Sequence, residues 1–216
     1  MKKTIVLSAS FLWLTACAQD YWQQEVHYNI RVSLNDTTHS LKGFETIEYF
    51  NHSPDTLNYI WFHLWPNAYR DESTALYSQL RKLGYAENPV NTETAGFIDS
   101  LQFTINGKFA IVEKDPDNID IVKLILPSPL LPDQKIIIAT PFFVKIPPFF
   151  SRMGYEGETF LISQWYPKPA VYDLTGWHPM PDLYTASIHR LFLECLSLPR
   201  YTRKESLWKR HRIRIH

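Results

Sequence analysis

Histidine is the residue type in this 216-residue chain that could most readily hold a metal. None of the histidines begins a His-Glu-x-x-His sequence, no two are close enough to form a local ligand pair, and no Cys-x-x-Cys occurs. We therefore predict no metal site and no catalytic residue in this chain. One histidine lies in an apolar run, where a hydrogen-bonded core residue is the favoured interpretation. The eight are His27, His39, His52, His63, His178, His189, His211 and His216, and the one in the apolar run is His63.

Other reactive arrangements are also absent from the sequence. There is no Gly-x-Ser-x-Gly sequence and no glycine-rich phosphate loop among only 7 glycines. Glu156 and Glu158 flank Gly157 and could act as a pair of carboxylates. A turn with two solvated charges is the favoured interpretation.

The most distinctive stretch is rich in aromatic residues and proline and covers residues 160–181. A strand is expected to end at Gln164, and a proline-stiffened segment follows it. Proline lowers the entropy cost of ordering, and aromatic rings offer amphipathic contact area. The segment suits an interface with another domain or with a ligand, or it folds on its own aromatic side chains. Those side chains are Trp165, Tyr166, Tyr172 and Trp177.

The residues before this stretch show the period-two alternation of β-strands. Apolar residues alternate with polar ones from Val26 to Leu34, which predicts a strand with one buried face. In the next strand we expect Glu45 and Glu48 to face solvent. Similar units recur every 8–12 residues or so, as in an all-β sandwich or curved sheet. The further strands are expected at 44–50, 57–65, 101–105, 109–112, 119–126 and 134–140, with an end at Pro147 and Pro148.

One interruption of the strand pattern predicts a short helix. Residues 71–73 can cap its start, leucines follow at three-to-four spacing, and Gly84 suits its end. Asn106 and Gly107 predict a tight hairpin. The expected fold is mainly β: an antiparallel sandwich or saddle with one short helical insertion, followed by an irregular or weakly helical basic tail.

Composition and charge restrict the class of protein. With 45% hydrophobic and 20% charged residues, the chain is neither a disordered polymer nor a multi-span membrane protein. The 22 basic and 22 acidic residues cancel, which argues against a nucleic-acid partner. They are distributed unevenly, because residues 17–181 are acidic overall and residues 182–216 are basic.

The first residues have the pattern of an export signal. Lys2 and Lys3 precede an uncharged apolar run that ends at Ala16. Leu14-Thr15-Ala16-Cys17 resembles the bacterial lipobox, which predicts lipidation of Cys17, attachment to a membrane and a signal over residues 1–18. Cleavage after Ala18 fits nearly as well, and a buried N-terminal strand is the plain alternative. We expect a periplasmic, outer-membrane or secreted protein.

The tail, residues 182–216, differs abruptly from what precedes it. It lacks strand alternation and contains Cys195, whose only possible cysteine partner is Cys17, so no disulfide framework is expected. A basic arm and a short helix from Ile188 to Leu196 are two interpretations. The hypothesis that we favour is a shifted reading frame after Pro181.

Five stretches in order resemble the N-terminal β-domain of the aminopeptidase N family of zinc metallopeptidases, the gluzincins. The resemblance covers about residues 25–181, within a predicted domain at 19–181. The forms His-Leu-Trp-Pro-Asn at 63–67 and Gly-Trp-His-Pro-Met-Pro at 176–181 are similar to a bacterial branch. In relatives this domain is a saddle of strands packed on a catalytic domain. The stretches are residues 28–34, 41–49, 62–69 (Phe-His-Leu-Trp-Pro-Asn-Ala-Tyr), 101–107 and 163–167 (Ser-Gln-Trp-Tyr-Pro), and Gly-Trp-His-Pro-Met-Pro follows at 176–181.

The resemblance implies a substrate-binding role for two residues. Family members carry Thr-Gln-x-Glu/Gln near the end of this domain. Its second position lies near the substrate pocket, and its fourth helps to hold the free amine of a peptide. Gln164 matches the second position, whereas Tyr166 replaces the acid or amide of the fourth.

The family's catalytic parts are not in this sequence. Neither His-Glu-x-x-His nor Gly-x-Met-Glu-Asn occurs, and hydrolysis in such enzymes needs zinc to activate water and a glutamate to take its proton. The resemblance thus implies a silent domain whose partner is the catalytic domain, with zinc and the peptide substrate expected only in a full-length parent. The alternatives are a surface-anchored module that binds carbohydrate or peptide, and an orphan structural lipoprotein.

Overall fold

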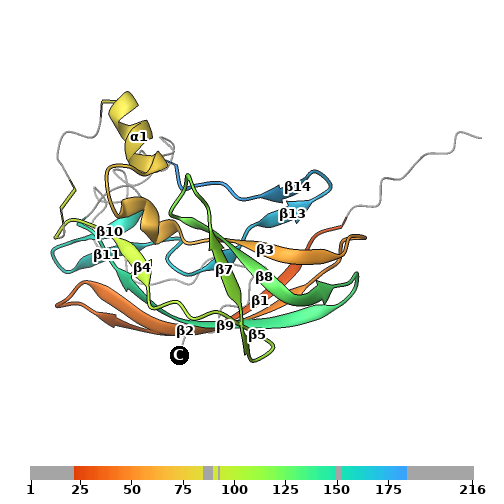
Figure 1. Cartoon of the computed structure of the whole chain (residues 1–216). Coiled ribbons are helices and arrows are strands. Elements are labelled where there is room, and N and C mark those ends of the chain that lie inside the picture. The colour runs from red at the N-terminus through yellow and green to blue at the C-terminus, as the bar shows by residue number, and fades with distance from the viewer. Residues whose placement is uncertain (1–21, 85–89, 92, 149–151, 184–216) are drawn as a thin grey trace, which may run out of the picture.

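The computed structural model describes residues 22–84, 90–91, 93–148 and 152–183. Within them the chain is mainly β, and most of its strands form two antiparallel sheets that lie one above the other in Figure 1. The expected fold class is therefore confirmed. The predicted signal, Cys17 and the tail from residue 184, with Cys195 and the helix at 188–196, lie outside the described residues.

The larger sheet has six strands and contains the two longest pairings. β2 lies between β1 and β9, and the register places Ile30 opposite Glu45 and Glu45 opposite Thr140. β5 and β4 both pair with β9 further along the sheet. The six strands are β1 (Glu25–Asn35), β2 (Ser40–Phe50), β4 (Phe97–Asp99), β5 (Thr104–Ile105), β6 (Lys108–Phe109) and β9 (Lys135–Lys145).

The second sheet has four strands in the order β12-β3-β8-β7. Its centre is the predicted apolar strand at 57–65, which ends at His63. Lys168 pairs with His63 at the β12 edge, which places these two residues side by side. The strands are β3 (Leu57–His63), β7 (Ile111–Lys114), β8 (Ile121–Leu130) and β12 (Lys168–Pro169).

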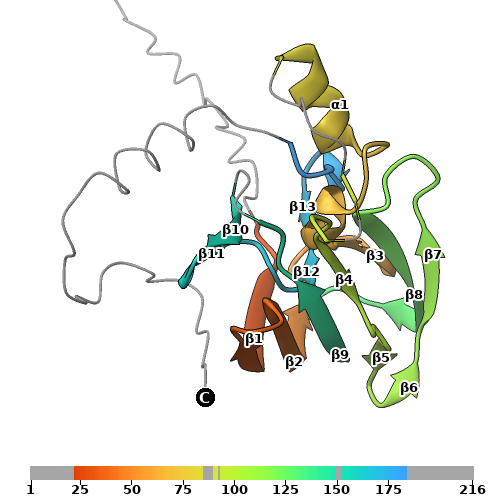
Figure 2. The ribbon, with the colours of Figure 1, turned by 90° about the vertical axis from the view of Figure 1, so that its left-hand side faces the viewer.

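Two hairpins extend from the sheets. β10 (Met153–Glu156) and β11 (Thr159–Ile162) pair around Gly157, so the favoured turn between Glu156 and Glu158 is confirmed. β13 (Val171–Asp173) and β14 (Gly176–His178) form a hairpin within the aromatic segment, which the sequence did not predict. Figure 2 shows the first hairpin projecting away from the two sheets.

Two short helices follow β3. The 3-10 helix η1 (Trp65–Tyr69) begins where the strand was expected to continue, because Pro66 occupies its first turn and cannot donate to a ladder. The predicted helix is α1 (Ala75–Lys82). Its cap is Thr74 rather than residues 71–73, and Gly84 ends it at a φ of 76°.

The core lies between the sheets and includes side chains from both. Phe62 and Phe142 are almost fully buried, and burial of each such side chain contributes roughly 1.5–3 kcal/mol. Gly43 allows close packing there, because an added Cβ would meet the Phe142 ring and lie 2.7 Å from the carbonyl oxygen of Arg31. No helix of the described residues is long and apolar enough to cross a membrane.

Two strand predictions need correction. Asn106 and Gly107 form the expected turn, with φ values of 49° and 80°. However, only Lys108 and Phe109 return beside β5, whereas Ile111 onward crosses to β8 in the other sheet. The prediction of one returning strand at 109–112 is thus wrong, since alternation does not reveal which sheet a strand joins.

The prediction that Glu45 faces solvent is also wrong. Its side chain is completely buried, whereas that of Glu48 is partly exposed. Alternate residues of a strand point to opposite faces, so positions 45 and 48 cannot share one face. Glu45 shares its face with Ile47 and Tyr49, which lie in the core.

Candidate functional site: an aromatic cleft

A cleft of about 910 Å³ lies where the first strands of the larger sheet meet the segment that follows β11. Seven tryptophan and tyrosine side chains line it, together with His63, other polar side chains and some aliphatic residues. The lining residues that carry the arguments below are Trp22, Tyr28, Tyr49, His63, Trp65, Gln164, Trp165, Tyr166, Lys168, Tyr172 and Asp173.

Both residues singled out by the resemblance line this cleft. Gln164 has a φ of 58°, a left-handed conformation that is uncommon outside glycine, and its side-chain oxygen accepts a hydrogen bond from Lys168 Nζ. The Tyr166 ring lies edge-on to Tyr28, with 5.3 Å between centroids, and to Trp165, with 5.2 Å. Burial raises the pKa of the Tyr166 hydroxyl, and the nearby Glu45 carboxyl adds to this shift.

Glu45 forms part of a polar cluster with the tyrosines of this wall. Neither carboxyl oxygen has a hydrogen-bond partner among the described residues, and the Tyr49 hydroxyl also has none there. Burial raises the pKa of Glu45 well above the ordinary carboxyl value. The neutral acid is consequently the form that the folded chain favours.

Two cations lie against Trp65. Lys168 Nζ is 3.4 Å from the ring centroid, and the Arg152 guanidinium carbon is 5.8 Å from it. Arg152 is paired with Asp182 at 2.8 Å, and the backbone N–H of Asp182 donates to Asp120 Oδ2 at 2.6 Å. Asp182 therefore packs into the β structure, although it begins the predicted tail.

The ionisable groups around Trp65 have shifted pKa values. Burial lowers the pKa of Lys168 to about 7, with Asp182 opposing and Arg152 assisting the shift. Burial raises the pKa of Asp182 to about 6, against the attraction of Arg152. In both residues, burial disfavours the charged form, and the attraction of the neighbouring opposite charge offsets this effect only in part.

His63 stands beside Lys168 in the same wall. Its side chain is buried, and burial followed by the Lys168 cation lowers its pKa to about 4, so the ring is neutral near pH 7. The backbone of His178 opposes this shift weakly, but neither ring nitrogen has hydrogen-bond geometry to a described residue. His63 is thus a buried residue as predicted, without the expected hydrogen bond in this part of the structure.

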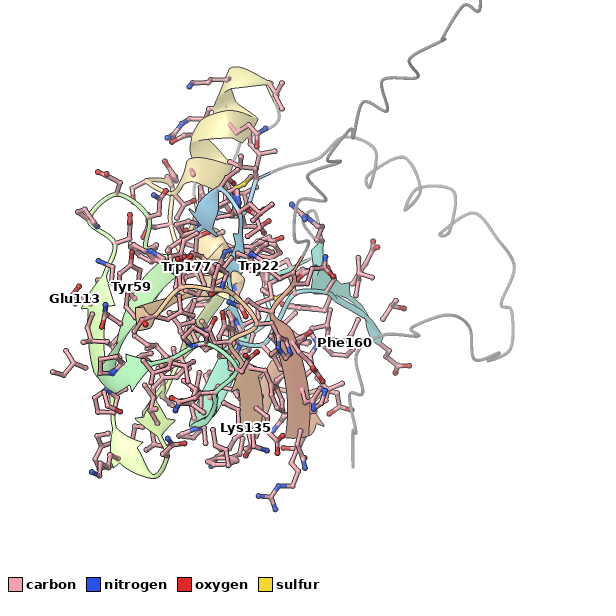
Figure 3. All side chains as sticks on the ribbon, turned by 90° about the vertical axis from the view of Figure 1, so that its right-hand side faces the viewer. Trp22, Tyr59, Glu113, Lys135, Phe160 and Trp177 are labelled. Atoms are coloured by element: carbon pink, nitrogen blue, oxygen red, sulfur yellow. The ribbon has the colours of Figure 1, made fainter. Side chains whose placement is uncertain are left out.

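The β13–β14 hairpin closes the cleft at another side. The Tyr172 ring is tilted against those of Trp22 and Trp177, with 5.4 Å and 4.8 Å between ring centroids, and both tryptophans are labelled in Figure 3. The Tyr172 hydroxyl donates to Asp55 at 2.7 Å. The contact to His178 and, after it, the hydrogen bonds that Asp173 accepts from Thr175 lower the pKa of Asp173 to about 2.

Among the described residues, no group of three or more histidine, cysteine, aspartate or glutamate side chains could hold a metal ion. Sequence reasoning missed Trp22, Tyr49 and Lys168 as cleft residues. Lys168 carried a detectable signal, because it lies within the proline-stiffened aromatic segment, four residues after Gln164.

Comparison with known proteins gives similar structures only. No protein-family model and no curated protein matches the chain. The M1 zinc metallopeptidase from Deinococcus radiodurans is similar at 14% identity and a TM-score of 0.38, with 63% of this chain and 25% of that chain covered. A mutant of the Deinococcus radiodurans enzyme bound to a Tyr-Ser-Ala substrate gives 13% identity, a TM-score of 0.38 and coverages of 62% and 24%. The chain spans about a quarter of the length of these structures.

Proposed function

We propose that this chain is the non-catalytic N-terminal β-domain of an exported, zinc aminopeptidase-like metallopeptidase. Zinc binding and peptide hydrolysis then belong to a separate catalytic domain, which is the partner of this one. Gln164 and Tyr166 contribute to the substrate-binding wall, and the chain is inactive by itself.

The observation that carries this proposal is the convergence of four resembling stretches on one cleft. Tyr28, Tyr49, Trp65 and Gln164 come from four of these stretches, and all four line it. Residues distant in sequence that meet in one concave site are typical of a binding site. If the four stretches served only to build the β fold, their residues would not need to line the same cleft.

Export and lipidation complete the proposal. The basic start, the apolar run and the lipobox-like Leu14-Thr15-Ala16-Cys17 support export with a lipid on Cys17. Mass spectrometry of the mature N-terminus distinguishes the two processing routes. A diacylglyceryl group on Cys17 supports anchoring, whereas an unmodified Gln19 terminus contradicts it.

The DNA downstream of the Pro181 codon tests the proposed family directly. We expect one of the other two frames to encode His-Glu-x-x-His with a distal glutamate. If these residues are encoded only in the original frame beyond His216, the frameshift hypothesis alone fails. If no frame downstream encodes them, the proposal fails as well.

A second candidate is a surface-anchored module that binds carbohydrate or peptide. The tryptophans and tyrosines of the cleft favour it, because aromatic faces provide amphipathic contact area for such ligands. Titration with oligosaccharides and peptides, followed by tryptophan fluorescence, tests it. Absence of any spectral change at millimolar ligand contradicts this candidate.

A further inference from the structure

The ammonium group of Lys168 lacks an anionic partner in its wall of the cleft. Its described contacts are the Trp65 ring and the side-chain oxygen of Gln164. No carboxylate of the described residues forms an ion pair with it, and the neighbouring Asp182 is paired with Arg152. A partly buried ammonium without an anion is costly, which makes it a receptor for a negatively charged group.

Further hydrogen-bonding atoms of the same cleft lack partners. The two ring nitrogens of His63, Trp22 Nε1 and the Tyr49 hydroxyl are buried and without a hydrogen bond among the described residues. A neutral histidine still has one N–H to donate, and indole nitrogen only donates. Buried polar atoms are usually satisfied, so these atoms are candidates to bind a ligand that accepts hydrogen bonds.

The lining contains little that would compete for such a ligand. Its one carboxylate is Asp173, which already accepts hydrogen bonds from Thr175 and contacts His178. The rest of the wall near Lys168 is the aromatic surface of Trp65, Trp165 and Tyr166. A ligand that fits has an acceptor anion attached to an apolar or aromatic group.

We propose that the cleft binds a carboxylate at Lys168, with the His63 N–H as a second donor and the aromatic wall holding the adjoining apolar group. Carboxylate matches this site because charge-assisted N–H···O bonds are the strong ones and a planar ring can lie on the tryptophan faces. The inference does not depend on the proposed family, since it concerns the ligand class of the cleft alone.

Three small probes test the proposal on the full chain. N-acetylphenylalanine carries the ring and the carboxylate, N-acetylphenylalaninamide is its neutral match, and phenylalaninamide carries an amine without a carboxylate. Binding is measured by tryptophan fluorescence, because Trp22, Trp65 and Trp165 line the cleft. We expect the carboxylate to bind at least about tenfold more tightly than either amide at pH 6.5, a difference that one charge-assisted contact can supply.

Variants at Lys168 assign the contact. Lys168→Met keeps the long apolar stem and is expected to abolish the preference, whereas Lys168→Arg keeps the charge and should retain part of it. Lys135→Met is the matched control, because Lys135 lies on β9 against Phe50 and does not line the cleft. Far-UV circular dichroism verifies that each variant is folded.

The pH dependence gives an independent readout. Lys168 faces Arg152, Asp182 and His63, and its pKa of about 7 means that most of it is neutral at pH 8.5. The preference for the carboxylate should therefore fall about tenfold or more between pH 6.5 and pH 8.5.

Four results would overturn the proposal: equal binding of the first two probes, tighter binding of phenylalaninamide, an unchanged preference in Lys168→Met, or a preference independent of pH. Tighter binding of the amine probe would leave the proposed family intact, because that family is tested by the downstream DNA.

Discussion

Replacement of Glu45 by glutamine should make the stability of this chain less sensitive to alkaline pH. Glu45 lies between Ile30 and Thr140 in the larger sheet, is completely buried and has no described hydrogen-bond partner. Burial raises its pKa well above the ordinary value, so the folded chain keeps the proton that the unfolded chain releases. Its contribution to stability is fully present below the unfolded pKa and is lost as pH rises toward the folded pKa.

The size of the effect follows from one proton. A difference of one bound proton changes the free energy of unfolding by about 1.4 kcal/mol per pH unit at 25 °C. While Glu45 stays protonated in the fold, the natural chain therefore loses stability relative to Glu45→Gln as pH rises from 6 to 8, by up to about 1.4 kcal/mol per pH unit. Lys168 and Asp182 also titrate near this range, but both chains contain them and their contributions cancel in the difference.

Urea unfolding at pH 6, 7 and 8 measures this difference. Glu48→Gln is the matched control, because Glu48 lies on the same strand, is partly exposed and pairs with Lys135 at 3.4 Å. Its difference from the natural chain should be nearly constant with pH. If the difference in unfolding free energy between Glu45→Gln and the natural chain is also constant with pH, the inference that Glu45 is buried as a neutral acid is refuted.

Three further substitutions test the packing by urea unfolding. Asn51→Ala should cost about 2–4 kcal/mol, because the buried amide donates to the carbonyl of Asp55 in the following turn and to that of Leu130 on β8, and a loss below about 1 kcal/mol would contradict this role. Gly43→Ala should cost about 1–3 kcal/mol through overlap with Phe142, whereas unchanged stability would disprove the close packing. Thr74→Ala should cost about 1 kcal/mol, since Thr74 accepts from the Tyr77 N–H at the start of α1, and Thr74→Ser should recover most of it.

The three long strands of the larger sheet, β1, β2 and β9, could be predicted because each buries one face, whereas β4 was not predicted. The alternation from Val26 to Leu34 corresponds to β1, and the Asn106-Gly107 turn corresponds to the hairpin of β5 and β6. The crossing of Ile111 onward to the other sheet could not be predicted, since it depends on contacts with β8. The burial of Glu45 was predictable, because Glu45 alternates in the strand with Glu48 and lies on the face of Ile47 and Tyr49. The expectation that it is exposed followed only from its being a charged residue type.

The cleft was only partly predictable for a related reason. Gln164 and Tyr166 were identified by resemblance, and the structure brings both into one cleft. Trp22 and Tyr172 are distant in sequence and meet only when the hairpin folds back. That Lys168 has no ion-pair partner among the described residues depends on which side chains surround it in the fold, so it could not be predicted from composition or spacing.

The most direct test of the account is a joint measurement of zinc content and aminopeptidase activity on the purified full chain. We predict that the chain, after incubation with zinc and removal of excess metal, retains far less than one equivalent and releases no amino acid from peptide N-termini. One tightly held zinc per chain together with release of N-terminal amino acids would contradict the assignment of the chain as a non-catalytic domain.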